Sequence, residues 1–117
     1  MNFCTQFVAA GDATLDGELL HGRNLDWSDW DAIDFLLGNP TIIVRHPEGR
    51  IPTASIGFPG NVTPYTAISA AALSMASNHA DALQAAIDQT GRTHLQTVRT
   101  AHDTATSLNH AVAFLPS

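Results

Sequence analysis

The sequence predicts an α+β fold in which antiparallel strands come first and helices follow. Short runs with the composition of strands, separated by turn residues, recur between residues 4 and 78. A helical spacing of apolar residues appears only from Thr93 onward. Strands followed by helices are typical of layered α+β folds. The chain has 117 residues, of which 44% are hydrophobic, so residues 1–117 suit one domain at most.

The first expected element is a hairpin near the N-terminus. Residues 4–10 and 18–24 have the composition of strands, and Asp16-Gly17 lies just before the second run. Asp-Gly is a strong turn signal in hairpins. The start of the first strand and the end of the second should therefore lie side by side.

The middle of the chain predicts four more strands. Residues 41–45 are the clearest, because Thr-Ile-Ile-Val-Arg is short and mostly β-branched. Further strands are expected over residues 51–57, 64–69 and 72–78. The last two should pair as a hairpin, although the intervening Ala-Ala is a poor turn sequence.

Helices are expected mainly near the C-terminus. A short one is expected over residues 30–37, and residues 81–90 are ambiguous between a loop and a helix. From Thr93 the apolar residues recur three or four apart, at Leu95, Val98, Ala101 and Ala105. Thr106 is expected to be the N-cap of a second helix.

Composition argues against several classes of function. The net charge is −6, and five arginines with no lysine make nucleic acid an improbable partner and exclude a Schiff-base lysine. No apolar run reaches the roughly 20 residues of a membrane span. His94, His102 and His110 are eight residues apart and drift around a helix, so we expect neither a metal nor a cofactor. His21 is expected to be a strand residue whose ring is hydrogen-bonded.

The hairpin would bring three reactive groups to one sheet edge. Cys4 begins the first strand, while Arg23 and Asp26 end the second. A nearby arginine favours the nucleophilic thiolate. Loss of residues 1–3 would also give Cys4 a free α-amine, which can act as general base for its own side chain. Two plainer interpretations stay open: a lone cysteine is often a small buried hydrophobic residue, and Arg23 with Asp26 would make an ordinary surface ion pair.

The same residues resemble a known family. Cys4-Thr5 at the start of a strand, followed by His-Gly-Arg-Asn-Leu-Asp-Trp over residues 21–27, resembles the cysteine-type N-terminal-nucleophile (Ntn) hydrolases. The resemblance is to the penicillin acyltransferase, acid ceramidase and bile-salt hydrolase group. Phe3 before the cysteine resembles the ceramidase members. The resemblance implies autoproteolytic cleavage of the Phe3–Cys4 bond.

A second block, residues 67–78, resembles the family segment Gly-Met-Asn-x-x-Gly-Leu that runs to a strand-end asparagine. Asn78 matches that asparagine, so the resemblance implies a role as oxyanion-hole donor. Ser69 and Ala72 replace the usual Asn and Gly of the segment. The residues that follow, 91–111, resemble the helices of these enzymes.

The resemblance implies a fold and an activity. The fold is a four-layer αββα sandwich, of which residues 1–117 match only the N-terminal portion. The activity is hydrolysis or acyl transfer on linear amide bonds of a small N-acyl substrate, with Cys4, Arg23, Asp26 and Asn78 at the site and no cofactor. Trp27, Trp30 and Phe35 would line an acyl pocket or belong to the core.

The rival hypothesis is a catalytically incompetent fragment that acts as an interaction module or as one subunit of a split protein. A half-complete sandwich would leave an apolar sheet face and strand edges uncovered. We therefore expect either association with the missing C-terminal portion or self-association.

Overall fold

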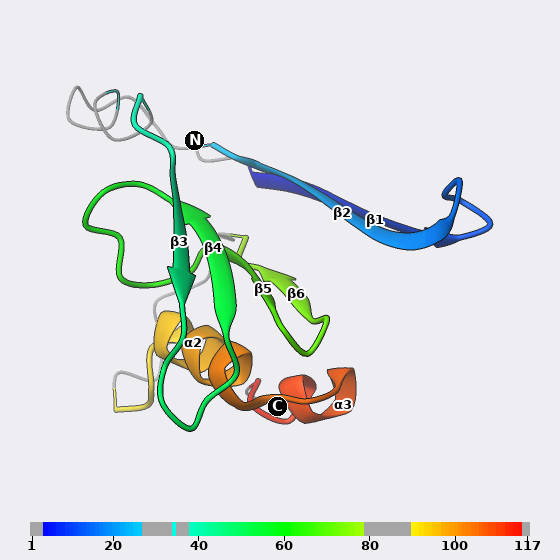
Figure 1. Cartoon of the computed structure of the whole chain (residues 1–117). Helices are drawn as coiled ribbons and strands as arrows, with labels where there is room; N and C mark the ends of the chain where they lie inside the picture. The colour runs from blue at the N-terminus through cyan, green and yellow to red at the C-terminus, as the bar shows by residue number, and fades with distance from the viewer. Residues whose placement is uncertain (1–3, 27–33, 35–37, 79–89, 116–117) are drawn as a thin grey trace.

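The computed structural model describes residues 4–26, 34, 38–78 and 90–115. Within these residues, six antiparallel strands in two sheets precede two helices, which confirms the α+β class (Figure 1). The helix expected over residues 30–37 lies outside the described residues apart from Asp34. The ambiguous segment 81–90 lies outside them apart from Thr90.

The first two strands form the expected hairpin. Strand β1 (Cys4–Gly11) pairs antiparallel with β2 (Gly17–Leu25). The loop between them is longer than a two-residue Asp-Gly turn, and the hydroxyl of Thr14 donates to the carbonyl oxygens of Gly11 and Glu18. Gly17 ends the loop with a φ of 72°, which is the left-handed region that glycine adopts without strain.

The second sheet is a four-stranded meander. Its strands are β3 (Thr41–Arg45), β4 (Thr53–Gly57), β5 (Thr66–Ser69) and β6 (Ser74–Ala76), in the order β3-β4-β5-β6. All four expected strands are present. Three of them are shorter than expected, because turns at their ends take over the flanking residues. The β5–β6 turn forms despite its alanines, with Ala72 at a φ of 58°.

Both C-terminal helices have side-chain caps. Helix α2 (His94–Thr104) begins with a capping box in which Thr93 accepts from the N–H of Gln96 and the Gln96 side chain accepts from the N–H of Thr93. Helix α3 (Leu108–Val112) has Ser107 as its N-cap, and the expectation of Thr106 was wrong. The hydroxyl one residue further along is the one that accepts from the N–H of His110.

Helix α2 packs on one face of the meander. The core between them is small and consists of Ala67, Val98, Ala101, Ala105 and Ala111 together with a fully buried His102. The two ring nitrogens of His102 lie 3.0 Å from the carbonyl oxygen of Val98 and 3.1 Å from that of Ala67. His102 therefore ties the helix to β5, although the sequence had not marked it as a core residue.

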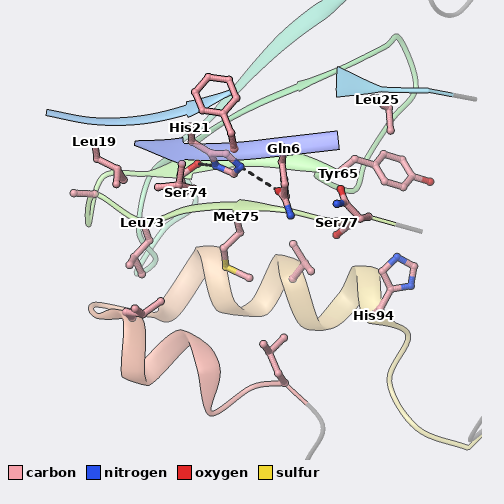
Figure 2. Close-up of a pocket in the computed structure, with 18 of the residues that line it drawn as sticks. Gln6, Leu19, His21, Leu25, Tyr65, Leu73, Ser74, Met75, Ser77 and His94 are labelled. Atoms are coloured by element: carbon pink, nitrogen blue, oxygen red, sulfur yellow. Dashed lines mark hydrogen bonds between the residues drawn. The ribbon is translucent and has the colours of Figure 1, made fainter. Parts of the chain in front are cut away.

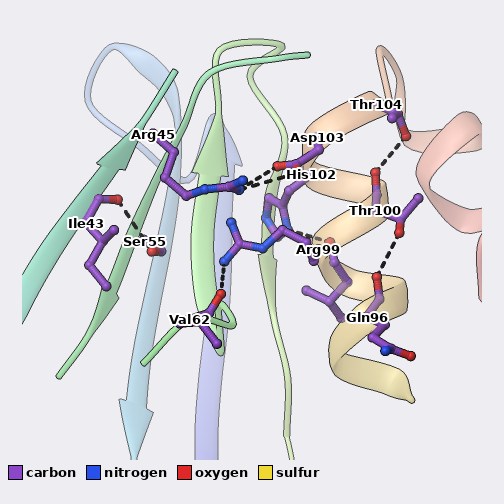
Figure 3. Close-up of polar contacts among 11 residues, drawn as sticks. Ile43, Arg45, Ser55, Val62, Gln96, Arg99, Thr100, His102, Asp103 and Thr104 are labelled. Atoms are coloured by element: carbon purple, nitrogen blue, oxygen red, sulfur yellow. Dashed lines mark hydrogen bonds and ion pairs between the residues drawn. The ribbon is translucent and has the colours of Figure 1, made fainter. Parts of the chain in front are cut away.

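Polar contacts add to this attachment (Figure 3). The Nη1 atom of Arg45 on β3 lies 3.0 Å and 3.4 Å from the two carboxylate oxygens of Asp103 on α2. The guanidinium of Arg99 on α2 donates to the carbonyl oxygen of Val62 in the loop before β5. The helix is thus joined to β3, to β5 and to the loop between β4 and β5.

The opposite face of the meander is apolar and exposed. The register places Ile42, Val44, Ile56 and Ile68 on this face, and their exposed fractions run from 53% to 71%. The hairpin reaches this sheet at β6, where His21 is hydrogen-bonded with Ser74 and Arg23 donates to the carbonyl oxygen of Ser77. The described residues therefore show a helix layer on one sheet face, and they do not establish an αββα sandwich.

Candidate functional site

The hairpin register fixes the surroundings of Cys4. Cys4 pairs with Leu25, and Gln6 pairs with Arg23. Because successive side chains alternate between faces, Cys4, Gln6, Arg23 and Leu25 share one face of the hairpin. Arg23 is the diagonal neighbour of Cys4, a relation that typically separates Cα atoms by about 7–8 Å. Cys4 is half-buried and carries a free thiol.

Arg23 is held in a poorly satisfied position. Its Nη2 atom donates to the carbonyl oxygen of Ser77, whereas Nε and Nη1 are buried and have no hydrogen-bond partner. Among the described residues, the structure shows an ion pair between Arg45 and Asp103 but none between Arg23 and Asp26. Buried polar groups normally find partners, so unsatisfied donors of a cation mark a place where an anionic group would bind favourably.

Asp26 and Asn78 lie at the ends of their strands. Asp26 follows the last residue of β2, and its Oδ1 accepts from Nδ2 of Asn24 at 2.7 Å. Asn78 is exposed and follows Ser77, the residue to which Arg23 is bonded. The Arg23–Ser77 hydrogen bond therefore brings the end of β2 to the segment that carries Asn78.

Asp26 and Asn78 both line an open pocket of about 1180 Å³. The pocket lies between the hairpin, β6 and the two helices (Figure 2). Its walls are largely apolar and include Leu19, Leu25, Leu73, Met75, Val98 and Leu115. Cys4 and Arg23 are not among the lining residues. The structure thus groups the four residues predicted from the sequence into two adjoining pairs, one on the hairpin face and one at the pocket.

A second polar cluster in the pocket was not predicted. His21 Nδ1 lies 2.6 Å from Ser74 Oγ, and His21 Nε2 lies 3.2 Å from Gln6 Oε1 (Figure 2). The sequence correctly indicated that the His21 ring would be hydrogen-bonded. It gave no sign of Ser74, because the two residues are 53 positions apart and meet only when the hairpin folds over β6.

Three further expectations concern metal binding, membrane spans and the aromatic residues. These residues contain no group of three or more side chains that could hold a metal ion. None of their helices is both long and apolar enough to cross a membrane. Trp27, Trp30 and Phe35 lie outside the described part of the chain.

Comparison of the chain with protein-family models, with curated proteins and with solved structures finds no match.

Proposed function

We propose that the chain is the N-terminal portion of an Ntn-type hydrolase or acyltransferase that acts on linear amide bonds through Cys4. The observation that supports this most strongly is the position of Arg23. It lies on the same hairpin face as Cys4 and has two buried donor atoms without partners. A guanidinium in that position would stabilise negative charge that develops at the reacting groups.

The proposed reaction uses only groups of the chain and water. After cleavage before Cys4, its α-amine takes the thiol proton, and the sulfur attacks the acyl carbon of the substrate. The amide C–N bond breaks, and the leaving amine receives that proton. Water or a second amine then attacks the thioester and releases Cys4. No cofactor is required.

Two further residues have roles in this proposal. Asp26 holds and orients the amine of Cys4, and Asn78 donates its side-chain N–H to the oxyanion. Both line the apolar pocket, which suits the hydrocarbon part of an N-acyl substrate. Association of the acyl chain with the pocket would place the amide near the end of the hairpin.

The exposed sheet face supports the architectural part of the proposal. In a sandwich of two sheets, the inner faces are apolar and pack together. The face that carries Ile42, Val44, Ile56 and Ile68 has this character and lies opposite α2. We propose that further strands of an αββα sandwich cover it.

The test combines processing with turnover. The intact mass of the purified chain would show whether residues 1–3 are removed, and a panel of N-acyl amino acids would measure amide hydrolysis. We expect Cys4→Ser and Arg23→Gln to lower turnover, whereas Arg92→Gln removes an exposed arginine and should not. Turnover that is equal in Cys4→Ser and the unchanged chain would overturn the proposal.

The exposed apolar face also favours the second candidate, an interaction module without activity. Ile42 and Val44 are 71% and 61% exposed, and burying such a face would stabilise an assembly. Sedimentation of the chain distinguishes the candidates when combined with the assay. Self-association without turnover would favour the module, whereas turnover that depends on Cys4 would favour the enzyme.

A further inference from the structure

We propose that Ser74, His21 and Gln6 form a second acyl-transfer site, which hydrolyses esters of apolar acyl chains. This inference goes beyond the amide hydrolase proposed above and does not depend on Cys4. The three side chains come from β6, β2 and β1, and all of them line the pocket. Figure 2 shows the imidazole between the serine hydroxyl and the glutamine side chain.

The hydrogen bonds select one tautomer of the neutral imidazole. Gln6 Oε1 can only accept, so His21 Nε2 carries the proton and donates to it at 3.2 Å. In a neutral imidazole the other nitrogen, Nδ1, then has no proton and presents a lone pair that can accept a hydrogen bond. His21 Nδ1 therefore accepts from the hydroxyl of Ser74 at 2.6 Å. A serine bonded to a base that is oriented by a third group is the arrangement of nucleophilic catalysis.

The backbone of β6 supplies a donor for the developing oxyanion. The backbone N–H of Ser69 donates to the carbonyl oxygen of Leu73 at 2.9 Å, and the backbone N–H of Ser77 donates to the carbonyl oxygen of Tyr65 at 2.8 Å. Bonded and non-bonded pairs alternate along an antiparallel ladder. The pair Ile68–Ser74 comes directly after the bonded pair Ser69–Leu73 and is therefore a non-bonded pair. Its N–H consequently points away from β5, toward the outer edge of the described sheet. The nucleophile thus has its own backbone donor beside it, as in other serine hydrolases.

The pocket determines the substrate class. Leu19, Leu73 and Met75 lie close to the cluster in sequence and line the same pocket, together with Leu108 and Leu115 of the C-terminal segment. These walls offer mainly apolar contact, and the described lining includes neither arginine nor lysine. A neutral ester with a medium-length hydrocarbon acyl chain fits this lining better than a charged or sugar-like substrate.

The reaction balances without a cofactor. Ser74 Oγ attacks the ester carbonyl carbon while its proton passes to His21 Nδ1. The C–O bond to the alcohol breaks, and the alcohol leaves with that proton. Water then attacks the acyl carbon, its proton passes to His21, and Ser74 Oγ regains a proton as the acid leaves.

Gln6 is a positioning residue in this site. It holds the imidazole in the correct tautomer, but it is neutral and does not stabilise the imidazolium as a carboxylate does. The site should therefore be slow. It follows that Gln6→Glu should raise ester turnover by about tenfold, because a charge-assisted hydrogen bond is stronger than a neutral one. A purely structural hydrogen bond would give no such increase.

The experiment uses the full chain with two probes, p-nitrophenyl octanoate and an alkyl fluorophosphonate. The fluorophosphonate loses fluoride as it modifies an activated serine, and peptide mapping then locates the label. We expect labelling at Ser74 and turnover that falls about 100-fold or more in Ser74→Ala and His21→Asn. Ser55→Ala, which removes a hydroxyl from strand β4 of the same sheet, should keep the label and the turnover. In Cys4→Ala the label should still be found at Ser74.

The variants also separate this site from the Cys4 proposal. A label at Ser74 in Cys4→Ala, together with lower ester turnover in Ser74→Ala, would support the second site even if amide hydrolysis were absent. A label elsewhere than Ser74, or equal ester turnover in Ser74→Ala and the unchanged chain, would overturn it. The labelling test uses the unchanged chain. Its result therefore holds even if one of the variants folds poorly.

Discussion

Replacing Ala72 by glycine should stabilise the protein. Ala72 has a φ of 58°, in the left-handed region where Cβ clashes with the following carbonyl oxygen. Relief of that clash is worth about 1–2 kcal/mol. The additional freedom of glycine in the unfolded chain offsets about 0.4–1 kcal/mol of this gain. A net gain of about 0.5–1 kcal/mol should raise Tm by roughly 2–6 °C for a domain of this size.

The matched control for this prediction is Ala70→Gly. Ala70 lies in the same turn and is exposed, but its φ is not positive. There glycine relieves no strain and only adds freedom to the unfolded chain, so Tm should fall. Calorimetry of both variants measures the difference. A decrease in Tm for Ala72→Gly as large as that for Ala70→Gly would refute the argument from backbone strain.

Three further substitutions test packing and mechanism. His102→Leu should lower the free energy of unfolding by about 0.5–1.5 kcal/mol, because it removes the buried hydrogen bond that joins α2 to the carbonyl oxygen of Ala67; urea denaturation measures this. Asp103→Asn should lower the free energy of unfolding by about 1–3 kcal/mol in the same assay, because the ion pair with Arg45 is only partly exposed. A loss below about 0.5 kcal/mol would show that the pair behaves like a surface ion pair. Asp26→Asn should lower amidase turnover about ten- to 150-fold with little change in Tm, and the reverse pattern would make Asp26 structural.

Local signals in the sequence predicted the elements well. The β-branched run at 41–45 is strand β3 to the residue, and the helical spacing expected from Thr93 onward is that of α2. These features depend on side-chain shape and capping within a few residues of one another. The hairpin was predicted from the strand composition of its two runs and from the Asp-Gly pair, although its loop is longer than the shortest hairpin turns.

Contacts between distant residues could not be predicted in the same way. The hydrogen bond of Arg23 to Ser77 and that of His21 to Ser74 join segments more than 50 positions apart. They depend on how the hairpin folds over β6, which no local pattern determines. The core position of His102 was missed for a related reason, since its burial depends on the carbonyl of Ala67 on another element.

The central claim is that Arg23 activates Cys4, and the chain's single cysteine makes a direct test simple. The measurement is the rate of alkylation by iodoacetamide at neutral pH, for the folded chain, for the chain in urea and for Arg23→Gln. The account predicts faster alkylation in the folded chain than in urea, and loss of that excess in Arg23→Gln. A folded chain that reacts no faster than the unfolded one, or an excess that survives Arg23→Gln, would contradict it.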